Sequence, residues 1–518
     1  MIGYKIRAAA CAIGALLIIG SQLPMRSADA AESPGSAGGA APTVARSTVA
    51  PSTVARPTVE GPVTGGRGTP ANAAAFDLAT VGYEQAEYFI TGHASAYTSA
   101  QLLTSDGKWT VTAGPPAPFK TRILVARPTN AKEFNGTVFV EWNNVSAGGE
   151  STPDWSSAHI EVTRRGAAWV GVSAQATGVV GGMSLVGALL QPLVRLDPDR
   201  YGTLAHPGDS YSYDIFSQAG AAVRAPAGIN PLGTLTPERV IAVGESQSAF
   251  RLTTYANALH SVTRVFDAYL VHSRQGGAAA LSQTPLTPIA APNPTFIRDD
   301  LDVPVIVLIT ETDLVVLGYR TARQADTKRL RIWEIAGTAH ADAGTLASAT
   351  DTGDGSGDVR YFDAMATPPA TPVLGCAPAI NAGHQVYVVR AAVHALDAWV
   401  RDGAVPPRAP RLELDPTGAG FVVDEHGNAR GGIRTPAVDA PVAKLSGLPA
   451  SGGSLCRLFG STTPFDPAKL ATLYPTHDAF VKAWNKAVDM SVKAGFVLRA
   501  DASNLKDAAA VSTIGGAA

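Results

Sequence analysis

The stretch at 239–248, RVIAVGESQS, decides the fold. It opens with a short apolar run rich in β-branched residues, which is typical of a buried strand, and a helical pattern over 247–260 follows directly. Gly244 and Ser248 stand two positions before and after Ser246, where a sharp strand-to-helix turn requires small residues. The stretch therefore predicts a tight turn that presents the hydroxyl of Ser246 at the N-terminus of a helix. The positive end of that helix favours a developing negative charge.

Apolar runs flank this turn on both sides and alternate with helical patterns. Strands are predicted at 122–127, 136–142, 167–173, 265–271, 303–309 and 331–335, and helices at 154–165, 384–401 and 477–497. Such alternation predicts an α/β fold with a mostly parallel, doubly wound sheet. Residues 178–232 and 341–382 interrupt the alternation, so we expect lid-like insertions there. The region after about residue 405 is predicted as a C-terminal extension with no assigned place.

Two later strands end in residues that can act with Ser246. The strand at 303–309 runs into Glu311-Thr312-Asp313, and the strand at 331–335 runs into a loop that carries His340. We predict Asp313 as the acid because it lies past the strand end, with Glu311 in reserve. The alternative is that Ser246 and Asp313 only cap helices and that His340 is a packed or surface histidine.

A triad of this kind requires donors for the oxyanion that forms during acyl transfer. The main-chain N–H of Gln247 is the first expected donor. The second is expected from the loop at 143–149, with Asn144 or Val145 as the candidate. The alternative is that this Gly-rich loop only connects a strand to a helix.

At three motifs the chain resembles the α/β-hydrolase superfamily: GESQS at 244–248, ETD at 311–313 and AGTAHAD at 336–342. More narrowly, it resembles a subgroup of bacterial exported α/β-hydrolase-domain proteins over roughly residues 75–410. The order Ser, acid, His matches that fold. The resemblance implies an α/β-hydrolase fold in which His340 activates Ser246 and Asp313 orients His340. It implies little about the substrate.

The leading hypothesis is a serine hydrolase that cleaves a small-molecule or lipid-like carboxylic ester through an acyl-enzyme. An acyltransferase with the same triad and a non-catalytic binding protein on a hydrolase scaffold are the alternatives. We expect no cofactor and no metal, since the acidic stretch at 351–358 lacks the spacing of a calcium loop. A formal net charge of −2 gives no reason to expect a nucleic-acid partner. The oligomeric state is not predicted.

The N-terminus has the pattern of a signal peptide. Lys5 and Arg7 precede an apolar run at 8–20, and small residues at Ala28 and Ala30 favour cleavage after Ala30 or Ala31. Residues 1–30 are therefore predicted to direct the protein to the cell envelope or the medium, with no stable membrane span after cleavage. An uncleaved membrane anchor is the alternative.

The composition divides the rest of the chain. Residues 31–72, rich in Ala, Pro and Thr, are predicted to be a disordered linker, and residues 75–518 the folded catalytic domain. Once the signal is removed, Cys376 and Cys456 remain. An even count in an exported protein is compatible with one disulfide, and two separate buried thiols are the alternative.

Overall fold

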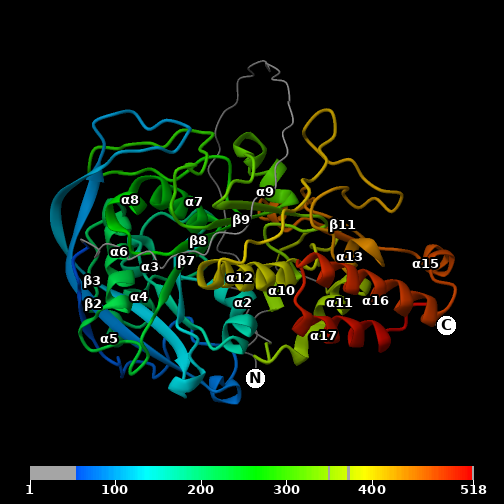
Figure 1. The fold of residues 1–518 in the computed structure, drawn as a ribbon, viewed down its shortest axis with the longest axis horizontal. Coiled ribbons are helices and arrows are strands. Elements are labelled where there is room, and N and C mark those ends of the chain that lie inside the picture. Colours follow the sequence, from blue (N-terminus) through cyan, green and yellow to red (C-terminus); the bar gives the residue numbers. More distant parts are fainter. Residues whose placement is uncertain (1–53, 348–350, 370–373, 516–518) are drawn as a thin grey trace.

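The computed structural model describes residues 54–347, 351–369 and 374–515 of the chain (Figure 1). The predicted signal peptide at 1–30 and the first part of the predicted linker lie outside the described residues. No helix in the described ranges has both the length and the apolar character needed to cross a membrane.

One large sheet organises the molecule, with the strand order β10-β9-β8-β7-β4-β5-β3-β2-β1-β6. Its parallel centre consists of β4 (Thr137–Trp142), β5 (Ala168–Val172), β7 (Arg239–Glu245), β8 (Ala268–His272), β9 (Val305–Thr310) and β10 (Leu330–Ile335). The antiparallel β3 (Thr112–Pro128) and β2 (Tyr83–Thr98) extend it, and β1 (Thr58–Glu60) and β6 (Ala227–Gly228) complete the edge. The mostly parallel α/β fold predicted from the sequence is confirmed.

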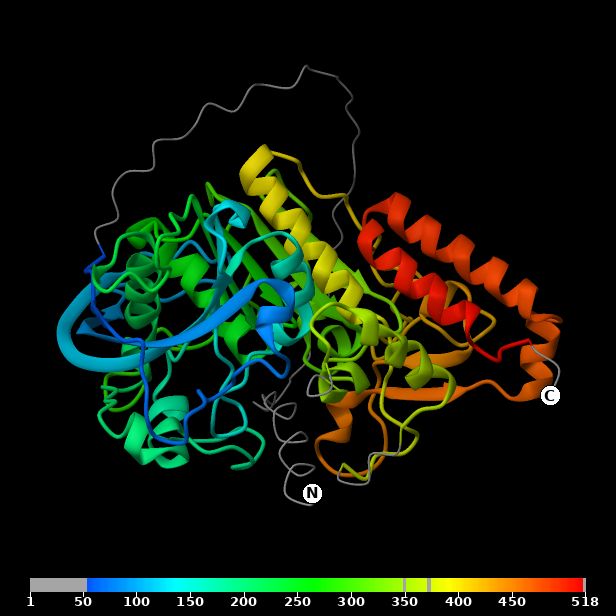
Figure 2. The ribbon, with the colours of Figure 1, turned by 90° about the horizontal axis from the view of Figure 1, so that it is seen from below.

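Helices cover both faces of this sheet, and alternate strand residues explain why. Ile241 and Val243 of β7 belong to the core shared with α2 (Pro153–Arg164) and α12 (Gln385–Asp402). Val240 and Ala242 belong to the opposite core, with α6 (Ser212–Arg224) and α7 (Gln247–Thr254). Because side chains along each strand point alternately to the two faces of the sheet, the strands contribute to two separate apolar layers. Figure 2 shows α12 crossing the molecule beside the sheet.

Short elements connect these layers. Along the first half of the chain they are η1 (Leu78–Val81), η2 (Ala131–Glu133), α3 (Ala176–Val179), α4 (Leu193–Leu196), α5 (Pro198–Tyr201), η3 (Asp209–Tyr211), η4 (Tyr255–Leu259) and α8 (His260–Thr263). Later come α9 (Glu311–Val315), η5 (Tyr319–Ala322), α10 (Ala343–Ala347), η7 (Ser356–Asp358) and α11 (Val359–Ala366). The helix predicted at 247–260 is thus α7 continued through the π-helical η4.

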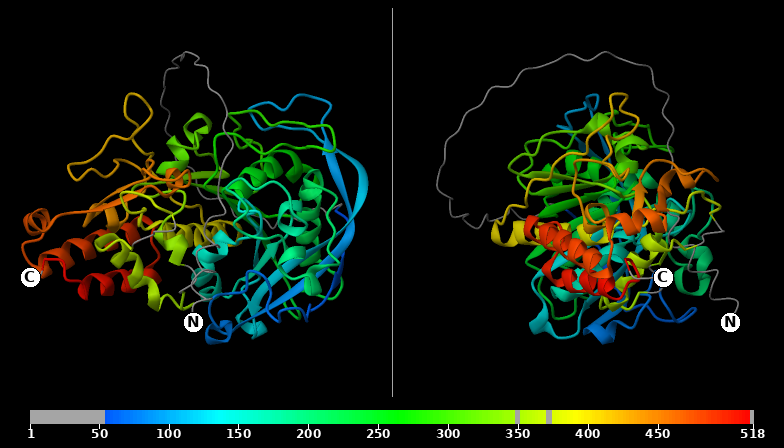
Figure 3. Two further views of the ribbon diagram at one scale, coloured as in Figure 1. Left: turned by 180° about the vertical axis from the view of Figure 1, so that it is seen from behind. Right: turned by 90° about the vertical axis from the view of Figure 1, so that its right-hand side faces the viewer.

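The C-terminal region forms a second lobe at the end of the molecule opposite β2 and β3 (Figures 1 and 3). It contains a small antiparallel sheet of β11 (Ala443–Ser446) and β12 (Ser461–Pro464). Its helices are α13 (Pro436–Asp439), α14 (Cys456–Phe459), α15 (Pro467–Leu473), α16 (His477–Ala494) and α17 (Arg499–Ala510). The helices α16 and α17 pack on each other, and Trp484 Nε1 donates to Leu505 O at 2.8 Å.

The prediction of a linker up to residue 72 is wrong for its described part, and the folded body begins before residue 75. The strand β1 pairs with β2 and β6, and its Val59 is buried. The guanidinium of Arg200 also donates to the carbonyls of Val63 and Gly65, both at 2.9 Å. Composition failed here because main-chain pairing and a buried arginine anchor the segment, and neither requires many apolar residues.

The predicted insertion at 178–232 also needs correction. It includes α6, whose Ile215, Phe216 and Ala219 are fully buried against the sheet. This part is a core helix and not a lid. In the second predicted insertion, at 341–382, α10 contacts α2 and α11 contacts α17.

Candidate active site

Ser246 stands on a strained turn between β7 and α7. Its φ of 58° and ψ of −117° lie in a region that non-glycine residues rarely adopt. The turn is held because Ser246 N donates to His272 O of the neighbouring strand at 2.8 Å. A Cβ at Gly244 would lie only 3.1 Å from Ser248 Cβ. Small residues at these two positions let β7 and α7 approach closely, as the sequence predicts.

The structure brings Ser246, His340 and Asp313 together. His340 Nε2 lies 2.9 Å from Ser246 Oγ, and His340 Nδ1 lies 2.6 Å from Asp313 Oδ1. Ser246 is 9% exposed, whereas Asp313 is fully buried. This chain of hydrogen bonds allows Nδ1 to donate to the carboxylate and Nε2 to accept the serine proton.

The start of α9 orients the carboxylate of Asp313. Thr310 N donates to Asp313 Oδ2 at 2.7 Å, and Asp313 N donates to Thr310 Oγ1 at 3.3 Å. This capping box fixes one carboxylate oxygen and leaves Oδ1 for the imidazole. The acid is therefore placed by the junction of β9 and α9.

Glu311, the reserve acid, serves another purpose. Its carboxylate accepts from Gly337 N at 2.6 Å and from Gly447 N at 2.7 Å. Burial raises the pKa of Glu311 to about 7. Glu311 therefore joins the acid turn to the loop of His340 and to the C-terminal lobe, while Asp313 alone of the two contacts the imidazole.

The loop after β4 lies beside the serine, and the prediction for Asn144 needs correction. Asn144 N donates to Ser151 O at 2.9 Å, so this N–H is not available to an oxyanion. The Asn144 side chain accepts from Ser146 N at 2.9 Å and donates to Glu245 O at 3.2 Å. The N–H groups of Val145 and Gln247 make no main-chain hydrogen bond to the described residues. These two groups remain the candidate donors.

Glu245 is a residue of the site that the sequence reasoning missed. Its Oε1 lies 3.6 Å from His340 Nε2. Burial, reinforced by the nearby carboxylates of Asp154 and Asp313, raises the pKa of Glu245 well above its usual range. In the sequence, the signal for a place in this site is the position of Glu245 directly before Ser246.

Three other histidines, His272, His384 and His394, do not replace His340. His272 Nδ1 pairs with Asp154 Oδ1 at 2.9 Å, and its Nε2 lies 2.9 Å from the amide nitrogen of Gln385. His384 is buried, which lowers its pKa to about 3. His394 pairs with Glu161 at 2.8 Å.

Acidic side chains of the stretch at 351–358 pair with other residues of the protein. Asp351 lies 3.0 Å from His159 Nε2, and Asp358 forms a buried ion pair with Arg390. Across the described ranges, no group of three or more His, Cys, Asp or Glu side chains is placed to hold a metal ion.

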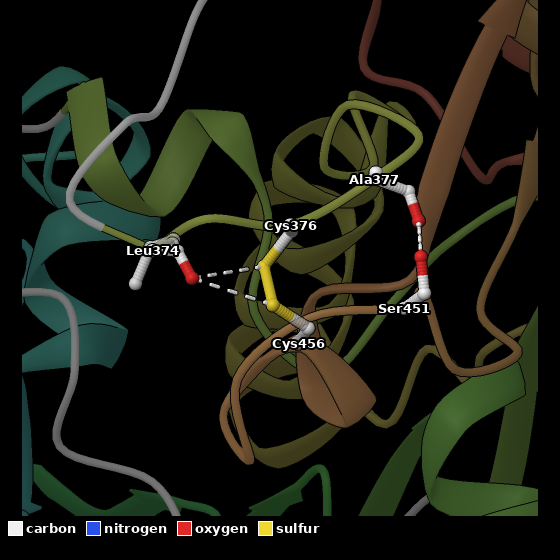
Figure 4. Close-up of a disulfide and its surroundings, with 5 residues drawn as sticks. All are labelled: Leu374, Cys376, Ala377, Ser451 and Cys456. Carbon is white, nitrogen blue, oxygen red and sulfur yellow. Dashed lines mark hydrogen bonds between the residues drawn. A yellow bond between two sulfur atoms is a disulfide. The ribbon is translucent and has the colours of Figure 1, made fainter.

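Cys376 and Cys456 form a disulfide, with their Cα atoms 5.4 Å apart (Figure 4). Beside it, Ala377 and Ser451 exchange two main-chain hydrogen bonds of 2.9 Å. Ser451 Oγ also donates to Ala377 O at 2.7 Å (Figure 4). The bridge therefore joins the segment before α12 to the C-terminal lobe at the start of α14.

Several solved structures share a likeness with part of the chain. Esterase Est22 has 12% identity and a TM-score of 0.30, covering 53% of this chain and 79% of that one. Acetyl xylan esterase 1 from Thermoanaerobacterium sp. has 10% identity and a TM-score of 0.27, covering 54% and 81%. A serine hydrolase without a lid from Xanthomonas campestris has 14% identity and a TM-score of 0.27, covering 53% and 98%. Such low values carry no weight for substrate or mechanism.

No curated protein matches the chain. A family model does, and it covers both the sheet and the C-terminal lobe. The model, described as "Alpha/beta hydrolase domain", matches residues 59–507, so the chain belongs to the α/β-hydrolase domain family.

Proposed function

We propose that the protein is a serine hydrolase that cleaves carboxylic esters through an acyl-enzyme. The observation that carries the proposal is the hydrogen-bonded chain of Ser246, His340 and Asp313, with distances of 2.9 and 2.6 Å. Activating a weak serine nucleophile requires an adjacent base that a third group orients. Family membership and the strained turn at Ser246 support the same reaction class.

In this reaction the hydroxyl of Ser246 attacks the ester carbonyl and passes its proton to His340 Nε2. Asp313 stabilises the imidazolium, and the N–H groups of Gln247 and Val145 receive the oxyanion. Collapse of the tetrahedral intermediate expels the alcohol, which takes the proton from His340. Water then attacks the acyl-enzyme by the same route, releases the acid and restores the serine. No redox or metal step is required.

Replacement of the nucleophile tests this proposal. We expect Ser246→Ala to lower kcat for p-nitrophenyl ester hydrolysis by about 10⁴-fold or more, because the covalent route is lost. Serine and alanine differ by one hydroxyl, so circular dichroism and the Tm should stay close to wild type. Ser248→Ala is the matched control and should keep most of the activity. Equal activity of Ser246→Ala and wild type would refute the nucleophile.

We also propose that the enzyme is exported and works in the cell envelope or the medium. The signal pattern in residues 1–30 motivates this, and the disulfide suits an oxidising compartment. N-terminal sequencing of the protein recovered outside the cytoplasm should begin at Ala31 or Glu32. A retained Met1 would contradict cleavage.

A further inference from the structure

The loop that carries His340 is held at both ends by one residue outside it. Asn381 Nδ2 donates to Gly337 O at 3.1 Å, and Ala343 N donates to Asn381 O at 2.8 Å. His340 lies midway between these two contacts. Asn381 is fully buried, so neither bond is exchanged for one to water.

The same residue joins this loop to the C-terminal lobe. Asn381 N donates to Phe459 O at 2.8 Å, and Asn381 Nδ2 also donates to Ser446 O at 3.2 Å. Its Oδ1 accepts from Gly383 N at 2.8 Å, which fixes the orientation of the amide. Both sides of the Asn381 amide are therefore committed to main-chain partners.

The middle of the loop is held from the same lobe. Ala341 N, next to His340, donates to Leu458 O at 3.2 Å. A Cβ at Gly460 would lie 2.8 Å from Ala339 Cβ, so the lobe packs directly against the other neighbour of His340. The lobe thus contacts both neighbours of His340, Ala339 and Ala341.

The disulfide fastens the two segments that make these contacts. Cys376 lies shortly before Asn381, and Cys456 opens α14, which carries Leu458 and Phe459. Figure 4 shows the two segments joined at the bridge. A bond between them limits how far Asn381 and Leu458 can move apart.

We propose that Asn381 is a positioning residue for the base His340, and that the Cys376–Cys456 disulfide keeps the segments that position His340 together. This inference rests on the proposed function. Asn381 touches no reacting atom; it acts by keeping His340 Nε2 within hydrogen-bonding reach of Ser246 Oγ. A shift of about 1 Å in such a group can lower the rate by about 10²-fold.

The test compares Asn381→Ala with a matched control, Asn428→Ala. Asn428 is equally buried and also bonds the main chain of β11, through Ala443 O and Leu445 N, but within the described part of the chain it makes no hydrogen bond to the loop of His340. Steady-state kinetics on a p-nitrophenyl ester are measured at a temperature where circular dichroism shows both variants folded. We expect Asn381→Ala to lose about 10²-fold in kcat with KM within twofold, and Asn428→Ala to keep kcat within threefold.

Equal losses of kcat in the two variants, or a folded Asn381→Ala with the kcat of wild type, would overturn the positioning role. If Asn381→Ala does not fold, Asn381→Asp keeps the size of the side chain and its bond from Gly383 N while removing both Nδ2 donors, and the same criteria apply.

The disulfide is tested on the wild-type protein. Dithiothreitol converts the bridge to two thiols and is itself oxidised to a cyclic disulfide; a thiol reagent then counts the free cysteines. The folded, reduced enzyme should lose kcat and recover it on reoxidation, and unchanged kcat with both thiols free would overturn the role of the bridge. Ser246→Ala runs in parallel. Activity in that variant removes the proposed function, whereas an inactive Ser246→Ala beside a fully active Asn381→Ala removes only this inference.

Discussion

At the scale of single residues, two neighbouring carboxyl groups at the end of β9 have separate tasks. Asp313 bonds to the imidazole, whereas Glu311 accepts two main-chain N–H groups. The sequence predicts both residues at the end of the strand. It does not show which of the two side chains points toward His340, because both lie in the same turn. The contact of Glu311 with Gly447 spans 136 positions and leaves no local signal.

The raised pKa of Glu311 predicts how stability varies with pH. Its pKa rises from 4.5 in the unfolded chain to about 7 in the fold. The folded state therefore binds the proton more tightly, and its stabilisation is complete below pH 4.5 and lost as the pH rises through about 7. We expect Glu311→Gln, which cannot ionise, to lack this pH-dependent contribution to the stability of the fold.

Thermal unfolding at pH 5 and pH 8 checks this. The Tm of wild type minus the Tm of Glu311→Gln should be larger at pH 5 than at pH 8. A Tm difference that does not change with pH would show that the carboxyl does not titrate in this range.

At the scale of elements, the stretch from β7 to α7 was predictable because an apolar run, a small-residue turn and a helix follow one another in the chain. The loop after β10, which carries His340, was predictable for the same reason. In the loop after β4, the prediction of Asn144 as a candidate donor was wrong, because the pairing of Asn144 with Ser151 depends on how that loop folds back. The strand β2 was missed because its buried residues do not alternate regularly.

The segment after β11 should be sensitive to added volume. A Cβ at Gly447 would lie 2.4 Å from Thr338 O and 2.5 Å from Glu311 Cβ. Backbone and a buried turn cannot yield easily, so we expect Gly447→Ala to destabilise the fold by about 1–3 kcal/mol and to lower kcat. Urea unfolding and ester kinetics measure both effects. Gly453→Ala is the control, because its Cβ would meet nothing closer than Leu374 O at 3.7 Å; equal effects of the two changes would contradict the steric argument.

At the scale of the whole molecule, a buried ionic cluster ties the N-terminal segment to the sheet. Glu87 accepts from Arg122 at 3.1 Å, from Arg200 at 2.6 Å and from the hydroxyl of Tyr201 at 2.8 Å. Arg122 in turn donates to Ala71 O, and Arg200 donates to Val63 O and Gly65 O. Composition alone could not reveal this cluster, and so the segment was predicted to be a linker.

Removing the shared carboxylate should therefore be costly. We expect Glu87→Gln to destabilise the protein by about 3–5 kcal/mol, because two buried guanidinium groups lose a charged partner. The exposed pair of Glu60 with Lys120 at 2.9 Å provides the control, and Glu60→Gln should cost about 0–1 kcal/mol. Urea unfolding compares the two variants. A similar small loss in both would show that the cluster does not anchor the segment.

The most direct measurement of the central claim is the site at which diisopropyl fluorophosphate reacts. Diisopropyl fluorophosphate forms an O–P bond only with an activated serine, releasing fluoride while the hydroxyl proton passes to the base. Trypsin cleavage after Arg239 and Arg251 then yields the peptide 240–251, and fragmentation separates Ser246 from Ser248. We predict one phosphoryl group per chain, on Ser246, and none in His340→Ala. An unlabelled protein, or a label on any other residue, would contradict the account.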